Sequence, residues 1–128
     1  MILALYHKLG EIADEHLIVI SSKIIYLPSG EPQRLRILLI DSTNLDVWFS
    51  LSGKYSYHWD RRIIGKGVYR FDNAQHKKWE KVRTYPHHLH HENEQNVIDS
   101  FIPQKPEEAI VYVLEFAQSI IAKNRANL

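Results

Sequence analysis

Alternation of apolar and polar side chains in short runs, interrupted at close intervals by turn residues, is the feature that most limits how this chain can fold. In residues 44–51 every second side chain is apolar, which is the period of a strand with one buried face. Similar alternating or continuous apolar runs lie at 17–27, 34–41, 54–63 and 68–73. Glycine, proline and serine between the runs indicate tight connections. We therefore expect an antiparallel meander of short strands.

The two ends of the chain carry the spacing of helices. Residues 1 to about 14 place apolar side chains three and four positions apart, at Ile2, Leu5, Leu9 and Ile12. A second helix is expected from Pro106, because proline is tolerated at a first helical position. Its apolar stripe consists of Ile110, Val113, Leu114, Ala117 and Ile121. The sequence thus predicts one α+β domain over residues 1–128, with an antiparallel sheet of about five to six strands and both helices packed on one face.

Composition excludes several classes of protein. The chain has no cysteine, so disulfides and thiolate metal sites are ruled out. No apolar run approaches the length of a membrane span, and the first apolar run of four residues is too short for a signal peptide. We expect a cytoplasmic protein with no membrane association and no cofactor.

Charge is unevenly distributed along the chain. Residues 54–91 contain nine lysines and arginines against three acids, a formal charge of +6 with neutral histidines, and six of the eight histidines. The remaining residues carry a formal charge of −5, although the total is only +1. Residues 54–91 are therefore where we expect contact with a polyanion.

Strand alternation brings several of these polar residues to one surface. If 55–59, 68–72 and 87–91 are strands, one face carries the side chains of His58, Arg70, Asp72, His88 and His90. Asn73 and His76 are expected at the rim of this face. The aromatic side chains of the same segments point the other way, towards the helices.

Two kinds of chemistry suit this set of side chains, and a non-catalytic role stays open beside them. In metal-free RNA cleavage, His58, His88 or His90 act as acid and base, Arg70 stabilises the phosphate, and Asp72 orients a histidine or the arginine. Substrate would also contact Asn73, His76, Lys77, Lys78 and Lys81.

Alternatively, a metal-dependent hydrolase or transferase would use Asp72, His76, His88 and His90 as ligands. In the non-catalytic interpretation, the basic surface formed by residues 54–91 only binds RNA or protein. Individual residues also have structural explanations: His58 can be a packed histidine between two aromatic residues, and Asp72 and Asn73 can cap a turn. His87 and His91 are expected on the surface.

Three motifs in this order resemble the TumE family of small prokaryotic toxins. They are Y-S-Y-H-W at 55–59, R-F-D-N-A-Q-H at 70–76 and T-Y-P-H-H-L-H at 84–90. The flanking helices fit as well, so the resemblance covers nearly the whole chain. Three positions depart from the family pattern: Gln75 replaces a proline, Lys77 a histidine and Tyr85 a phenylalanine. The change at Lys77 weakens a metal role for residues 76–77.

The resemblance implies the toxin of a type II toxin–antitoxin pair. Its motif residues in this sequence are Tyr57, His58, Arg70, Asp72, Asn73, His76, His88 and His90. The implied partner is a cognate antitoxin, expected to carry a helix-turn-helix DNA-binding domain, and an RNA substrate is expected by analogy with other small toxins.

Overall fold

Each strand of the sheet pairs with the strand that follows it in the chain. The computed structural model describes residues 1–126 and contains one antiparallel sheet in the order β1-β2-β3-β4-β5-β6-β7. The strands are β1 (Val19–Tyr26), β2 (Pro32–Leu39), β3 (Asn44–Phe49), β4 (Tyr55–Asp60), β5 (Val68–Asp72), β6 (His88–His90) and β7 (Val97–Asp99). Two 3₁₀ turns, η1 (Arg62–Ile64) and η2 (Lys77–Trp79), lie in the connections after β4 and β5. The expected α+β meander is confirmed.

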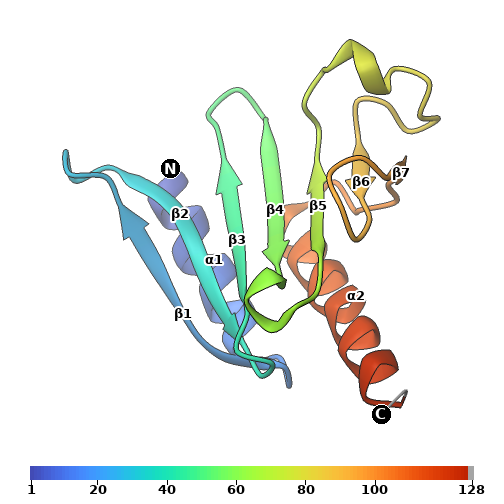
Figure 1. Cartoon of the computed structure of the whole chain (residues 1–128). Helices are drawn as coiled ribbons and strands as arrows, with labels where there is room; N and C mark the ends of the chain where they lie inside the picture. Colours follow the sequence, from blue (N-terminus) through green and yellow to red (C-terminus); the bar gives the residue numbers. More distant parts are fainter. Residues whose placement is uncertain (127–128) are drawn as a thin grey trace.

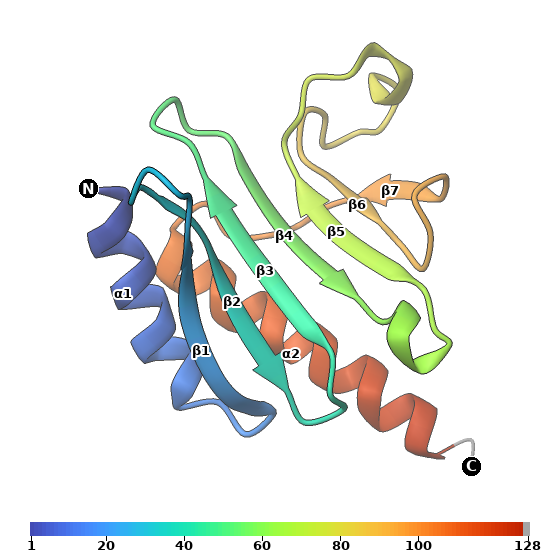
Figure 2. The same ribbon diagram turned by 60° about the vertical axis from the view of Figure 1, so that its left-hand side comes forward.

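Both long helices cover the same face of the sheet. The helices α1 (Ile2–Asp14) and α2 (Pro106–Ala126) contact each other and lie behind the strands in Figure 1, and Figure 2 shows α1 beside β1 and α2 crossing behind the sheet. Gly10 allows α1 to approach β1 closely, because a Cβ at this position would lie 3.2 Å from the Ser22 hydroxyl oxygen. The expected apolar stripe of α2 is buried at Ile110, Val113, Leu114, Ala117 and Ile121. Their burial against the sheet forms the core, as apolar area removed from water drives such packing.

The strand register decides which side chains face the helices and which face away. On β4, Tyr57 and Trp59 are buried in the core, and on β5 Tyr69 and Phe71 are buried there too. The residues between them therefore lie on the face that the helices leave open. On that open face His58 pairs with Arg70, which in turn pairs with His90. Its next row across the strands is Ser56, Asp72, His88 and Asp99.

The sheet has more strands than the expected five or six. The seventh, β7, is a three-residue edge strand that pairs with β6. Val97–Asp99 is too short to show a period of its own, so its strand conformation depends on pairing with a neighbour distant in sequence. The connection between β5 and β6 contains η2, a 3₁₀ turn within an otherwise irregular loop. Over the described residues, neither helix combines the length and the apolar character needed to cross a bilayer.

Candidate functional site

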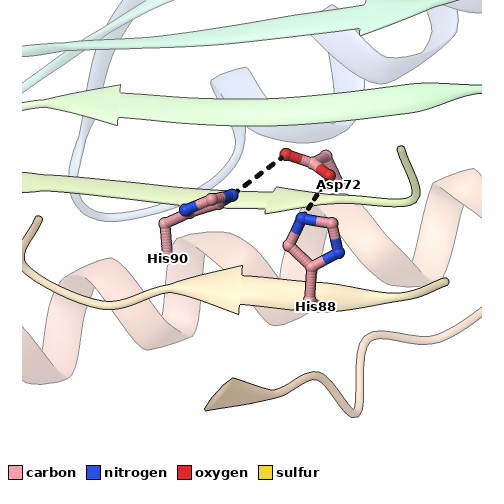
Figure 3. Close-up of side chains that lie close together, drawn as sticks. All are labelled: Asp72, His88 and His90. Atoms are coloured by element: carbon pink, nitrogen blue, oxygen red, sulfur yellow. Dashed lines mark ion pairs between the residues drawn. The ribbon is translucent and has the colours of Figure 1, made fainter. Parts of the chain in front are cut away.

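Asp72 and His88 lie directly opposite each other at the ends of neighbouring strands. Asp72 is the last residue of β5 and His88 the first of β6, and the two form a cross-strand pair. Figure 3 shows both side chains, together with His90, projecting from the same side of the two strands. The long connection 73–87 leaves the sheet at this point. The candidate site therefore lies at one end of the sheet, on its open face.

The carboxylate of Asp72 is the centre of the site. Its Oδ1 accepts hydrogen bonds from His88 Nε2 at 2.7 Å and from the backbone N–H of Ala74 at 3.1 Å. Its Oδ2 accepts from Arg70 Nε at 2.7 Å. Burial alone would raise the pKa of Asp72, but the hydrogen bonds from His88 and Arg70 outweigh it and hold this pKa well below its usual range. Asp72 is thus ionised at any pH near neutrality.

The ring of His88 donates from both of its nitrogens. Nδ1 lies 2.8 Å from the carbonyl oxygen of Pro86, which can only accept, and Nε2 lies 2.7 Å from the Asp72 carboxylate. Two donating nitrogens define the imidazolium form. Burial opposes this charge, yet the hydrogen bond to Asp72 raises the pKa of His88 above 6.5. With 1% of its side chain exposed, His88 is a buried cation that fixes the carboxylate.

His90 is held as the opposite, neutral form. Its Nδ1 lies 2.9 Å from the carbonyl oxygen of Glu94 and must donate to it. Its Nε2 lies 3.1 Å from Nη2 of Arg70, and because a guanidinium can only donate, Nε2 accepts. The 3.6 Å between Nε2 and Asp72 Oδ2 (dashed in Figure 3) is then an electrostatic contact without a shared proton. The lone pair of His90 Nε2 is directed at Arg70.

Arg70 binds a carboxylate that the sequence did not point to. Its Nη1 donates to Glu94 Oε1 at 3.0 Å, and its Nη2 lies 2.8 Å from Oε2, a two-pronged pair. Glu94 belongs to the β6–β7 connection, which is anchored by a backbone hydrogen bond from Val68 to Glu92. A Cβ at Gly67 would lie 1.9 Å from the Glu92 carbonyl oxygen, so only glycine allows this approach. Glu94 has no periodic signal, because a long-range loop contact places it.

His58 differs from the other histidines of the face. It is half-buried on β4 beside Arg70, and within the described residues its ring makes no hydrogen bond. Burial and the neighbouring Arg70 charge lower the pKa of His58 below 6.5, against weaker opposing effects of nearby carboxylates. A neutral imidazole with a free nitrogen can accept a proton from a substrate.

The geometry of a metal centre is present only in part. Ligand atoms of Asp72, His88 and His90 lie within 4.8 Å of one another, whereas His76 is not part of this group. The donors are already neutralised, since Asp72 binds the His88 imidazolium and the Arg70 guanidinium. A divalent cation would have to displace the charge of Arg70 and remove a proton from His88. The cluster is therefore better suited to hold an arginine than a metal ion.

The remaining predicted residues lie around this cluster. Both ends of the Asn73 amide are used inside the protein: Oδ1 accepts from the Tyr55 N–H at 2.9 Å and Nδ2 donates to the Gly53 carbonyl at 3.0 Å. Asn73 holds the β3–β4 turn. His76 is exposed and caps η2, where its Nδ1 accepts from the Lys78 N–H at 3.2 Å.

The connection between β5 and β6 (residues 73–87), called the basic loop below, lies beside the cluster of Arg70, Asp72, His88 and His90. Lys77, Lys78 and Lys81 are exposed, and the ammonium of Lys78 lies 4.8 Å from the centre of the Trp79 ring. The Trp79 ring in turn meets the His90 ring edge-on at 6.0 Å. The loop thus places positive charge and an aromatic ring next to the histidines.

His87 does not lie where the sequence placed it. Instead of standing on the surface, its ring stacks on Tyr55 with 5.8 Å between centroids, and its Nδ1 is 2.8 Å from the Tyr55 hydroxyl. His87 is thus only partly exposed, because alternation continued from β6 turns its side chain to the face opposite His88.

Comparison with known protein families identifies a family whose model covers most of the chain. The model of the family described as Toxin TumE matches residues 8–121, which include α2 up to Ile121 and all of the sheet. No curated protein and no solved structure matches the chain.

Proposed function

The chain belongs to the TumE family of toxins, and from this premise we propose that it is the toxin of a type II toxin–antitoxin pair and acts as a metal-free endoribonuclease. One observation carries the proposal. Arg70 holds a carboxylate by two hydrogen bonds next to His58, a neutral histidine whose ring is free in the described structure. An anion-binding arginine and a free base are the two groups that cleavage through a ribose hydroxyl needs first.

Glu94 marks where a phosphate would bind. Its two oxygens accept from Nη1 and Nη2 of Arg70, as two oxygens of a phosphate would. The Glu94 side chain is 44% exposed and that of Arg70 28% exposed, so a phosphate from solvent can compete for the guanidinium. Arg70 stays fixed meanwhile, since its Nε donates to the buried Asp72.

His58 takes the proton of the ribose 2′-hydroxyl. Its lowered pKa keeps the ring neutral at pH 7, so that no proton has to be lost first. The 2′-oxygen then attacks the phosphorus, the bond to the 5′-oxygen breaks, and the products are a 2′,3′-cyclic phosphate and a 5′-hydroxyl.

The second proton transfer is assigned to His90. Its Nε2 lies 3.1 Å from the Arg70 guanidinium, so a phosphate bound there brings the leaving 5′-oxygen close. For this step His90 Nε2 takes a proton from solvent, Arg70 Nη2 gives its N–H to the phosphate instead, and the ring then donates the proton to the 5′-oxygen. His88 and Asp72 are positioning residues, because His88 is buried and Asp72 holds Arg70.

The substrate chain would follow the basic loop. Lys77, Lys78 and Lys81 can contact its phosphates, and the exposed part of Trp79 can stack on a base. Family membership implies a cognate antitoxin. We expect this partner to carry a helix-turn-helix domain.

Replacing the proposed base tests the function directly. Purified wild-type protein should cleave single-stranded RNA in the presence of EDTA, and His58→Ala should lower kcat/KM by about 10²- to 10⁴-fold. The acidic limb of the wild-type pH profile should lie below pH 6.5, because the pKa of His58 is lowered. The measurement is cleavage of a labelled RNA followed on a denaturing gel.

The control is His7→Ala, which removes an exposed histidine of α1. It should leave cleavage unchanged. Intact RNA with wild-type protein under every condition, or equal activity of His58→Ala and wild type, would contradict the assignment.

A further inference from the structure

A second concave site lies across the sheet from the histidines. It is a cavity of about 550 Å³, in the range of small-molecule sites. Its lining combines the ends of β3 and β4, the residues before β6 and the connection into α2 (Figure 1). The aromatic part of the wall consists of Phe49, Tyr55, Tyr57 and His87. Phe49 and Tyr57 meet edge-on at 5.8 Å, and Tyr55 and His87 are stacked.

One buried polar atom beside this cavity has no hydrogen-bond partner among the described residues. Ser100 is 6% exposed and lines the cavity, and its Oγ makes no hydrogen bond within the described structure. The Ser100 backbone is fixed, since its N–H donates to Thr84 Oγ1 at 2.9 Å. Because Ser100 Oγ itself has less than 1 Å² exposed, a ligand reaches it only after a change of the Ser100 rotamer. A hydrogen bond made in that rotamer recovers the free energy that the unpartnered hydroxyl costs. The side chain of Gln104, exposed at the mouth, adds a second polar group.

The cavity and the histidine face share the same end of the sheet. Three residues of its wall, Tyr55, Asn73 and His87, are sequence neighbours of Ser56, Asp72 and His88, which form one row on the open face. Because side chains alternate along a strand, the first three point to the cavity and the last three point to the open face. The cavity therefore lies one residue beyond the Ser56–Asp72–His88 row, and the row that contains Arg70 lies two residues further along the strands.

We propose that this cavity binds a nucleobase of the RNA substrate, whose strand passes around this end of the sheet between the cavity and the phosphate held by Arg70. Aromatic walls suit the faces of a heteroaromatic ring, and Ser100 Oγ and Gln104 suit its polar edge. The inference rests on the proposed function, because it takes the substrate to be RNA.

Nucleosides test the cavity separately from catalysis, because they carry no phosphate. Isotope-labelled full-length protein is titrated with adenosine, guanosine, cytidine and uridine, and amide shifts are followed by NMR. At least one nucleoside should saturate shifts at Tyr55, His87 and Ser100. Ser100→Ala should weaken that binding about three- to tenfold, the effect of one lost hydrogen bond. Ile102→Trp, which puts a larger side chain into the lining of the cavity, should abolish it.

Ser119→Ala is the matched control, since its hydroxyl lies on the exposed side of α2 and bonds only its own helix. It should bind the nucleoside as wild type does. The inference is overturned if no nucleoside shifts these residues, if Ser100→Ala and Ile102→Trp bind as wild type, or if only the antitoxin protein shifts them. Binding by a wild-type protein that fails to cleave RNA supports the cavity and contradicts the proposed function, so the two failures are distinguishable.

Discussion

Among the described residues Arg70 has three side-chain partners, and they differ in how firmly they are held. Asp72 and His90 are buried and fixed by further hydrogen bonds, whereas Glu94 lies in a loop with 44% of its side chain exposed. Opening the site therefore requires the release of Glu94 alone. Because an exposed ion pair contributes little free energy, a substrate phosphate can replace it at small cost.

Removing the charge of Glu94 should strengthen substrate binding. In Glu94→Gln the Arg70 guanidinium no longer binds a competing carboxylate. KM for RNA should therefore fall about two- to fivefold with little change in kcat, which corresponds to an ion-pair free energy of about 0.5–1 kcal/mol. Glu11→Gln removes the same charge from an exposed position of α1 and is the control. A rise in KM of Glu94→Gln would show that Glu94 assists substrate binding instead of occupying its place.

At the scale of the strands, the β5–β6 pair is held together by a buried ion pair. Asp72→Ala leaves the His88 imidazolium and Arg70 without their anion, so the free energy of unfolding should fall by about 3–5 kcal/mol. Urea unfolding measures this loss. Asp14→Ala, which removes an exposed carboxylate of α1, should cost much less. Equal losses in the two variants would contradict a structural role for the pair.

The same ion pair gives the stability a pH dependence with a definite sign. The pKa of His88 is raised above 6.5, so its contribution is complete below pH 6.5 and is lost as the pH rises through the raised value. The pKa of Asp72 is lowered, so its contribution is present above pH 3.8 and is lost as the pH falls further. Wild-type protein should unfold more easily at pH 9 than at pH 6, and Asp72→Asn should reduce that difference. An unchanged difference would refute the pairing.

The sequence predicted the strands and the shared face because one face of the sheet is buried. A slip of one residue would turn Tyr57 and Trp59 out to solvent, so alternation fixes the register and with it the side of His58 and Arg70. The same rule also predicts that His87 lies opposite His88, a consequence that the surface expectation overlooked. Glu94 and β7 could not be predicted, since long-range contacts of a short loop place them.

At the scale of the whole molecule, positive charge gathers at one segment of a nearly neutral chain. Residues 54–91 carry a formal +6 and the rest −5. Part of this charge is neutralised internally, as at Arg61 with Asp41 and Arg70 with Asp72. The lysines of the basic loop are exposed, and they remain available for phosphates.

The dependence of RNA binding on salt concentration measures the phosphate contacts of these lysines. Changing Lys77, Lys78 and Lys81 together to glutamine should weaken RNA binding and lower the slope of log K against log[salt] by about 2, from roughly 0.7 for each phosphate contact on a single strand. A control variant changes three lysines outside residues 54–91 to glutamine, namely Lys8, Lys23 and Lys123. Equal slopes of log K against log[salt] in both variants would show that the basic loop does not contact the RNA.

The chemical nature of the RNA ends tests the central claim most directly. Attack by the ribose hydroxyl with His58 as base leaves a 2′,3′-cyclic phosphate on one product and a 5′-hydroxyl on the other, with or without EDTA. Mass spectrometry of the products from a defined oligonucleotide identifies both ends, and a 2′-deoxy substitution at the cut site should abolish cleavage there. Products ending in a 3′-hydroxyl and a 5′-phosphate, formed only with a divalent metal, would contradict the account.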